Sequence, residues 1–438
     1  MKLQKLVLTT ALALGVAGPA SAANWLALQG TEPAGSTDRA KLWGFIQPQY
    51  FYTENTKLKA GPWAGQKAVF NQSGPERTSS NTFQIRRARL GIRGTNFPLD
   101  SKTNYFLLIE AGKNGITEFD SAVAMTDASV TFSHIPHARV RVGQFKTPTA
   151  EEGLQAIHVF DYINFTTGTG QMLLERFVDE DGSRANFKNG LNGSVSAFRD
   201  IGIQVFDIFQ TGNNWEHSYA VMVGNGNGIN RTDNNNEKDY YAYWSSAKVF
   251  AGKGARRQEL KMFAWGQTGK RTLEYVNGVA GKEDFDRDRW GVGFTFRKGK
   301  YRAAAEYVDS DGMIFNGTDG GAVAGALNNA GTAVASINMA PKGDAESYYI
   351  HLGYAVLPKL ELDVRYDYLD RLSDSKTGER EFDTLTLGFQ YFFNKKTRAI
   401  VNYEFRDADA PGFSSSAGPN QVLDTFDDRI GVQILAIY

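Results

Sequence analysis

A strict alternation of apolar and charged residues constrains the fold of this 438-residue chain more than any other feature of its sequence. In the stretch LELDVRYDYL, residues 360–369, every second side chain from Leu360 to Tyr368 is apolar or aromatic, and those between are charged. Successive side chains of a strand point to opposite faces, so this stretch forms a strand with one apolar and one charged face. Residues 383–393 and 397–407 repeat the pattern. The sequence therefore predicts an all-β fold.

The connections between these strands alternate in length. Short turns, such as 357–359 and 394–396, alternate with longer polar stretches. A transmembrane antiparallel up-and-down β-barrel has this arrangement, and the chain is long enough for about 16 strands. The final stretch, residues 429–438, also alternates and ends in the aromatic Tyr438, which resembles the recognition signal of outer-membrane barrels. We therefore expect an outer-membrane barrel of about 16 strands.

Two other fold classes are less favoured. A soluble β-sandwich or lectin-like domain also has alternating strands, but a core of about 400 residues normally divides into several domains. The chain contains no linker, proline-rich hinge or charge block that marks such a division. A helical membrane protein is excluded, because no apolar run of 18 residues follows the N-terminal stretch and the mean hydropathy is −0.38.

The first residues have the pattern of a secretory signal. Lys2 and Lys5 precede an apolar stretch that ends in small residues, so residues 1–22 are predicted to be a signal peptide and residues 23–438 the barrel, with cleavage after Ala23 as the alternative. Removing the signal leaves 46 basic and 48 acidic residues, a balance that predicts no nucleic-acid or other polyanion partner. The chain has no cysteine, so it has neither disulfides nor thiolate metal ligands. We expect it in the bacterial outer membrane, in contact with lipid.

Three long segments interrupt the strands, at 148–190, 225–239 and 311–344. The first carries apolar residues such as Leu173 and Leu174, and it either folds inward and narrows the pore or forms a lid outside it. The third is rich in glycine, alanine and asparagine and is expected to be a mobile loop.

The stretch QIRRARLGIRG, residues 84–94, carries an unusual density of arginine. In a strand, Arg87, Arg89 and Arg93 share one face. An arginine on the lipid face costs about 2 to 4 kcal/mol near mid-bilayer, so three of them would cost on the order of 10 kcal/mol, and these side chains must face the lumen. Phe83 and Ile85 have the same parity as the arginines, which predicts a bulge or strand end near Arg86.

The same argument turns other charged residues inward. Arg139 and Arg141 alternate with valines and are predicted to face the lumen. Further inward residues are expected to be Arg289, Arg297, Arg302, Glu110, Asp127, Glu306, Glu361, Asp363 and Glu404. A row of arginines offers an oxyanion successive sites of charge-assisted hydrogen bonding. The alternative is that the arginines pair with the acids and only support the barrel wall.

Several motifs resemble those of a known family, the phosphate-selective porins O and P. They are RRARLGIRG, DASVTF followed by RVRVGQFKTP, RDIGIQVFD, and YAVMVGNGNG followed by NNNEKDYYA. The resemblance covers most of the mature chain. It implies a 16-stranded outer-membrane porin, usually a homotrimer, that passes anions through a basic constriction.

By position in these motifs, the resemblance implies that Arg86 and Arg87 are paired constriction arginines and that Asp127 is a nearby carboxylate that modulates binding. Lys146, Arg176 and Arg184 are further candidates. Together with the lumenal arginines, the predicted pore-lining and anion-binding set is Arg86, Arg87, Arg89, Arg93, Asp127, Arg139, Arg141, Lys146, Arg176 and Arg184.

The function expected from these features is passive diffusion of small solutes through a water-filled channel, with a preference for phosphate or other oxyanions. The alternative is a barrel that sheathes a periplasmic electron carrier. An enzyme is not expected, because only the HIPH stretch brings two of the five histidines together, and its Pro136 favours a turn over a helical metal site. No catalytic residue, metal site or cofactor is therefore predicted.

Overall fold

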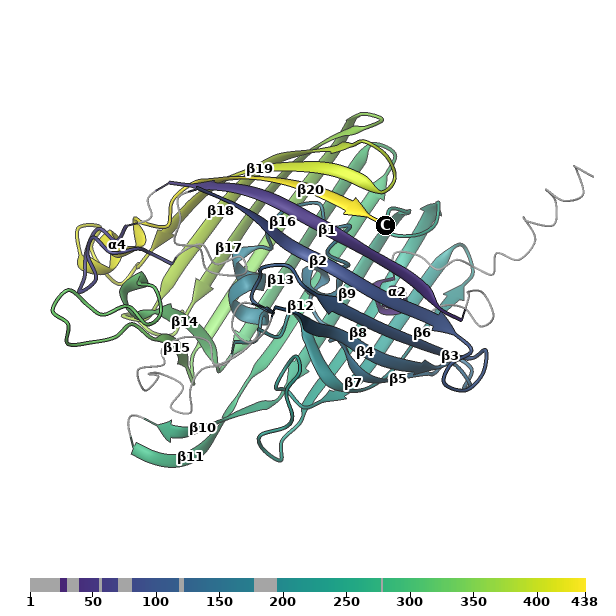
Figure 1. Ribbon diagram of the computed structural model, residues 1–438, viewed down its shortest axis with the longest axis horizontal. Helices are drawn as coiled ribbons and strands as arrows, with labels where there is room; N and C mark the ends of the chain where they lie inside the picture. Colours follow the sequence, from purple (N-terminus) through teal and green to yellow (C-terminus); the bar gives the residue numbers. More distant parts are fainter. Residues whose placement is uncertain are drawn as a thin grey trace, which may run out of the picture.

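In a computed structural model of the chain, sixteen antiparallel strands form one closed barrel (Figure 1). The structure describes residues 24–29, 39–54, 57–69, 81–117, 122–176, 195–276 and 279–438. The barrel strands, in order around the ring, are β1 (Lys41–Thr53), β2 (Asn81–Thr95), β3 (Thr103–Glu110), β4 (Ala124–Phe132), β5 (Arg139–Lys146), β6 (Arg199–Thr211), β7 (Trp215–Gly224), β8 (Asp239–Ala251), β9 (Gln258–Thr268), β12 (Asp288–Lys298), β13 (Tyr301–Asp311), β16 (Asp344–Leu357), β17 (Leu360–Arg371), β18 (Arg380–Phe392), β19 (Thr397–Asp409) and β20 (Arg429–Ile437). The predicted fold class and strand number are confirmed.

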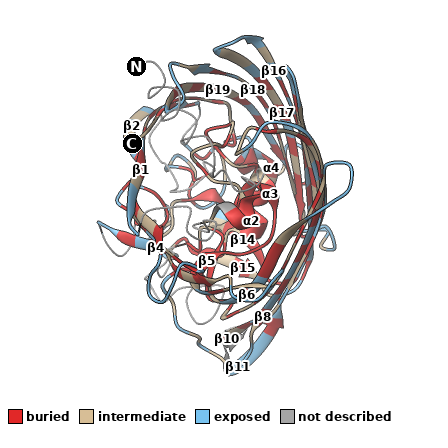
Figure 2. Ribbon diagram, turned by 90° about the vertical axis from the view of Figure 1, so that its right-hand side faces the viewer, coloured by how far each residue is buried: buried red, intermediate tan, exposed pale blue. Residues whose placement is uncertain are grey.

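The barrel has its apolar side chains outside and its charged side chains inside. On β16, Ile350 and Leu352 are 51% and 53% exposed, whereas His351 between them is 8% exposed. Arg365 and Asp367 on β17 are only 2% and 1% exposed. Figure 2 shows buried residues recurring along the barrel strands and gathered on the segments within the ring. An outer surface of this kind is stable against lipid, because its apolar side chains are then kept out of contact with water.

The two ends of the barrel differ. At one end the strands are joined by short turns, including the predicted turns between β16 and β17 and between β18 and β19, and at the other end by long segments (Figure 1). The C-terminal strand β20 pairs with β1, with Phe45 opposite Ile437 and Thr53 opposite Arg429, and this pairing closes the ring. Closure leaves no unpaired sheet edge, as a lipid environment requires.

The third long segment differs from the expected mobile loop. Residues 312–343 contain a two-stranded sheet, β14 (Ile314–Thr318) and β15 (Ile337–Ala340), and a short 3-10 turn η2 (Asp319–Gly321). Phe315 and Ile337 are buried in a small apolar cluster with Leu273 and Phe285. These come from a second hairpin, β10 (Lys270–Val276) and β11 (Val279–Asp286). The apolar residues at the ends of the Gly- and Ala-rich stretch thus pair as strands and pack in a cluster, whereas its composition indicates only a loop.

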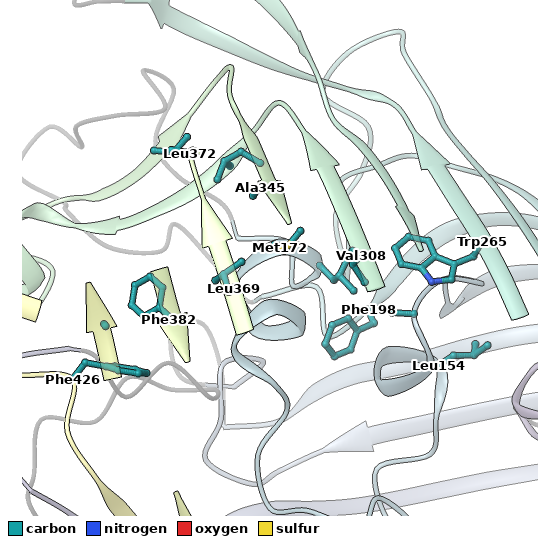
Figure 3. Close-up of a cluster of buried hydrophobic side chains, with 14 of the residues drawn as sticks. Leu154, Met172, Phe198, Trp265, Val308, Ala345, Leu369, Leu372, Phe382 and Phe426 are labelled. Atoms are coloured by element: carbon teal, nitrogen blue, oxygen red, sulfur yellow. The ribbon is translucent and has the colours of Figure 1, made fainter. Parts of the chain in front are cut away.

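Residues 147–176, which we call the inner segment, leave β5 and lie inside the barrel. The inner segment contains the helical turn α3 (Glu151–Leu154) and the π-helical turn η1 (Thr169–Leu173). Leu154 and Met172 belong to an apolar cluster with side chains of the facing wall, namely Trp265 on β9, Val308 on β13 and Leu369 on β17 (Figure 3). Apolar packing therefore fixes the inner segment across the lumen.

A second segment lies within the barrel, near the end with the short turns (Figure 1). Residues 24–29, the N-terminal segment, contain the helical turn α2 (Trp25–Leu28), and Trp25 and Leu26 are buried. Among the described residues, no helix combines the length and apolar character that a bilayer crossing requires. The predicted signal peptide, residues 1–22, lies outside the described residues.

The helical turn α4 (Gly418–Leu423) lies in the connection between β19 and β20, at the end with the long segments. There Val422 and Leu423 pack in the same apolar cluster as Trp63 and Phe426. Described parts of the connections between β1 and β2, between β13 and β16 and between β19 and β20 therefore share one apolar cluster.

Candidate functional site

A bulge in β2 places two consecutive arginines in the barrel interior. Gln47 of β1 pairs with Arg87, but the next residue, Pro48, pairs with Ile85, so Arg86 has no residue opposite it. Arg86 and Arg87 are both buried, whereas Phe83 and Ile85 are exposed on the outside. A β-bulge lets one strand insert an extra residue and redirect its side chain. The bulge predicted near Arg86 is thus confirmed.

The bulge gathers positive charge in one place. A cavity of about 60 Å³ between β2 and the inner segment is lined by five basic side chains, which we call the basic cluster: Arg86, Arg87, Arg89, Lys146 and Arg199. None of the described residues that line this cavity is acidic. Four of the five were predicted, and the structure brings them together from β2 and β5.

Two carboxylates behind this cavity hold two of its arginines. The Nε of Arg89 donates to Glu110 at 2.7 Å, and Glu110 also accepts hydrogen bonds from the backbone N–H groups of Ala88 and Gly112. Arg199 donates from Nε and Nη2 to Asp127 at 3.0 and 2.9 Å. The predicted Asp127 therefore bonds to Arg199 rather than to the arginine pair. Arg199, at the start of β6, was missed, because it precedes the alternating part of its motif.

Lys146 and Arg87 are also oriented by hydrogen bonds. The Nη1 of Arg87 donates to the amide oxygen of Gln47 at 2.9 Å. The Nζ of Lys146 donates to the carbonyl oxygens of Gly153 at 2.8 Å and Gln155 at 2.6 Å. These carbonyls lie at the end of α3, so Lys146 links the wall to the inner segment.

Three predicted arginines lie nearer the short turns, away from the basic cluster. The Nη2 of Arg141 donates to the carbonyl oxygen of Leu26 at 2.9 Å, and its guanidinium stacks over Phe206. Arg139 forms an ion pair with Asp207, and Arg93 stacks over Trp43. Arg141 thus holds the N-terminal segment in the lumen.

Arg176 and Arg184 belong to the long segment after β5. Arg176 donates from Nη1 to the carbonyl oxygen of Gly170 at 2.6 Å, and its guanidinium stacks over Phe315. It therefore stabilises the fold of the inner segment rather than joining the basic cluster. Arg184 lies outside the described residues.

Asp161 of the inner segment meets four arginines, three on barrel strands and one, Arg256, on the short connection between β8 and β9. Its oxygens lie 3.5 Å from Arg256, 3.6 Å from Arg302, 3.8 Å from Arg398 and 3.9 Å from Arg297. Burial disfavours the charged form of Asp161, but the guanidiniums, those of Arg302 and Arg256 first, outweigh it and hold the pKa well below its usual range. Asp161 is therefore ionised at neutral pH.

Other acids of the inner segment also bind bases of the wall and of the long connections. Glu151 accepts from Lys261 at 2.7 Å and from the indole N–H of Trp25 at 2.8 Å. Glu152 pairs with Arg365 at 3.3 Å. Glu175 lies 3.0 Å from both Arg271 and Arg287; burial opposes its ionisation, yet these arginines lower its pKa. The bases facing the inner segment on this side are thus matched by its acids, unlike those of the basic cluster.

The family of the chain follows from sequence comparison. A profile of the Gram-negative porins matches residues 9–411, which is most of the chain. This chain is a Gram-negative porin. The inward-facing charges, the apolar outer surface and the internal segment described above are therefore features of an outer-membrane porin.

Solved porin structures share this porin's fold. OmpF of Salmonella typhi in complex with daunomycin is 13% identical, with a TM-score of 0.55, and the match covers 91% of this chain and 97% of that chain. An anion-selective porin from Comamonas acidovorans is 14% identical, with a TM-score of 0.50, and the match covers 91% of this chain and 99% of that chain. No curated protein sequence matches this chain. At such low identity, these likenesses show the fold alone.

Proposed function

We propose that this porin is a water-filled channel for the passive diffusion of small solutes and that it prefers anions, including phosphate and other oxyanions. The basic cluster carries the proposal. Five cationic side chains converge between the wall and the inner segment, and no described residue that lines their cavity is acidic. Arg86 and Arg87 lie nearest the bulge and, as the sequence motifs imply, act as the paired constriction arginines.

Three of the cationic groups have a supporting role in this proposal. Glu110 and Asp127 fix the guanidiniums of Arg89 and Arg199, and the inner-segment carbonyls fix Lys146. Held in this way, these cationic groups present a rigid surface of N–H donors beside the permeation path. An anion moves quickly from one donor to the next only if it binds weakly to each of them. Glu110 and Asp127 weaken the binding because they partly neutralise the charges of Arg89 and Arg199.

Two further observations support the channel. The structural neighbour from Comamonas acidovorans is described as anion-selective, and its fold resembles this one. The described part of the inner segment packs across the lumen against the facing wall, which reduces the room for a folded electron carrier. We therefore favour a diffusion channel over a sheath or an enzyme. We also propose a homotrimer, which chemical cross-linking of the porin in native membranes tests.

The test of the anion preference is the loss of the two bulge arginines. In planar bilayers under a KCl gradient, Arg87→Gln should lower the ratio of chloride to potassium permeability by up to about 25-fold, since a unit charge at 4 Å in water contributes about 1 kcal/mol, with opposite sign, for each of the two ions. Arg86→Gln should act alike, and phosphate should block chloride current less in both variants. Lys395→Gln, the same loss of one positive charge on the exposed turn between β18 and β19, is the control. An unchanged ratio in the Arg86 and Arg87 variants would refute the proposal.

A further inference from the structure

A second cavity, of about 240 Å³, adjoins the basic cluster. It shares Arg89, Lys146 and Arg199 with the cavity of the cluster and extends from there along β1 to β3 toward the short turns. Short turns of such barrels face the periplasm. A solute that has passed the basic cluster from outside therefore meets this cavity next.

The walls of this cavity are aromatic. Trp43 and Phe45 of β1, Phe106 of β3 and His158 of the inner segment line it, and their rings are in contact. Trp43 stacks on Phe106 with ring centroids 6.0 Å apart and an interplanar angle of 12°. His158 lies 5.7 Å from Trp43 and 5.3 Å from Phe45. Apolar side chains of Leu108, Leu154 and Ile157 complete the lining.

The charge of the cavity is positive. Its basic lining residues are Arg89, Arg93, Lys146 and Arg199, and Asp127 is the one acid among its described lining residues. Of the three Arg89 nitrogens, only Nε donates to Glu110, and the two terminal nitrogens have no hydrogen-bond partner among the described residues. A cation is therefore disfavoured here, and an anion finds donors at the aromatic wall.

Inorganic anions do not match this lining, because ions lose hydration against apolar side chains and gain nothing from aromatic rings. A ligand with a flat apolar ring and one carboxylate gains from both sides, from ring packing and from charge-assisted hydrogen bonds. The volume is below the roughly 300 Å³ of the smallest drug-sized pockets, so it admits a single ring.

We propose that this cavity is a binding site for monocyclic aromatic carboxylates, with Arg89 binding the carboxylate and Trp43, Phe45 and Phe106 packing against the ring. The proposal deepens the proposed anion channel and rests on it for the route by which the ligand arrives. The site then makes the porin selective for aromatic acids over small inorganic anions.

The test compares three probes in planar bilayers with the purified porin. Benzoate carries ring and charge, acetate carries charge alone, and benzyl alcohol carries the ring alone. Benzoate should reduce the chloride current at concentrations where acetate and benzyl alcohol have no effect. Trp43→Leu should raise the half-blocking benzoate concentration by roughly threefold to tenfold, the range measured for aromatic pairs. Phe263→Leu, the same kind of change on the far wall, should leave it unchanged.

The outcomes separate this site from the channel function. Equal effects of benzoate and acetate, or an unchanged benzoate block in Trp43→Leu, would overturn the site even if the channel prefers anions. A benzoate block that Trp43→Leu weakens in a channel without anion preference supports the site and removes the proposed function. Arg89→Lys, which keeps the charge opposite Glu110, is the second variant: it should weaken the benzoate block and retain the fold, as judged by trypsin resistance.

Discussion

Substituting Asp161 by asparagine tests how charge on the inner segment sets selectivity. The side chain keeps its size, and its amide oxygen still accepts from Gln390, whose Nε2 lies 3.1 Å from Asp161 Oδ1. The change removes one negative charge among four arginines, and Arg256 and Arg302 keep Glu361 as a partner. The variant should therefore fold and carry one more uncompensated positive charge in the lumen.

The expected change in the anion-to-cation permeability ratio follows from the position of the Asp161 carboxylate. Asp161 lines a lumenal cavity and its side chain is 13% exposed, so a passing ion that reaches this cavity feels at least the interaction expected in water. A unit charge contributes about 1 kcal/mol at 4 Å in water, a factor of about five for each ion. The anion gains and the cation loses, so their permeability ratio should rise by up to about 25-fold at low salt and by less at 1 M, where the Debye length is about 3 Å.

The assay is the zero-current potential across a planar bilayer at 0.1 M and at 1 M KCl. Glu237→Gln, a matched change on the exposed connection between β7 and β8, should leave the potential unchanged. If Asp161→Asn leaves the ratio unchanged, or shifts it toward potassium, the carboxylate does not act on the permeation path and the reasoning is refuted.

Three further predictions follow from separate parts of the structure. Burial, together with the charges of Arg398 and Lys146, lowers the pKa of His158 to about 3, below the usual value near 6.5, so the unfolded chain binds the extra proton. The porin should therefore lose about 3 kcal/mol of stability between pH 7 and pH 4, and a urea titration should show no such contribution in His158→Gln. Arg141→Leu removes the charged hydrogen bond to the carbonyl oxygen of Leu26, which contributes about 1.5 to 3 kcal/mol. The N-terminal segment should then leave the lumen, and the single-channel conductance should rise. A conductance equal to that of the unmodified porin would contradict the anchoring role of Arg141. Leu387→Arg places a charge on the lipid face at the middle of β18 and should lower the folding free energy in lipid vesicles by about 2 to 4 kcal/mol, whereas a change below about 0.5 kcal/mol would mean that this face does not meet lipid.

The wall of the barrel was predictable from sequence because the alternation of apolar and charged residues within each strand indicates which face meets lipid and which faces the lumen. On β17, every charged residue between Leu360 and Tyr368 alternates with an apolar one, and that period fixes the two faces without knowledge of any neighbour. The bulge was predictable for the same reason, since Ile85 and Arg87 cannot share a face of a lipid-exposed strand. Local parity therefore gives the strands, the inward charges and the arginine pair.

The arrangement inside the barrel was not predictable in this way. Asp161 meets Arg256, Arg302 and Arg398 only because the inner segment crosses the lumen and the barrel closes around it. No local pattern marks a residue for such a contact. The same holds for Arg141, whose lumenal position was predicted but whose partner, the backbone of Leu26, comes from a segment 115 residues away.

Residues 311–344, expected to be a mobile loop, show another reason why part of the structure could not be predicted from the sequence. Its glycines and alanines indicate flexibility, but a few apolar residues at its ends, such as Phe315 and Met339, pair in β14 and β15 and pack against a neighbouring hairpin. Composition averages over these few positions, whereas tertiary packing depends on them.

The zero-current potential of the unmodified porin in a tenfold KCl gradient tests the central claim most directly. The account predicts a potential with the sign of chloride preference, and phosphate added to the bath should reduce the chloride current. A potential near zero, or one with the sign of potassium preference, would contradict an anion-preferring channel, because the basic cluster then does not act on the ions that pass.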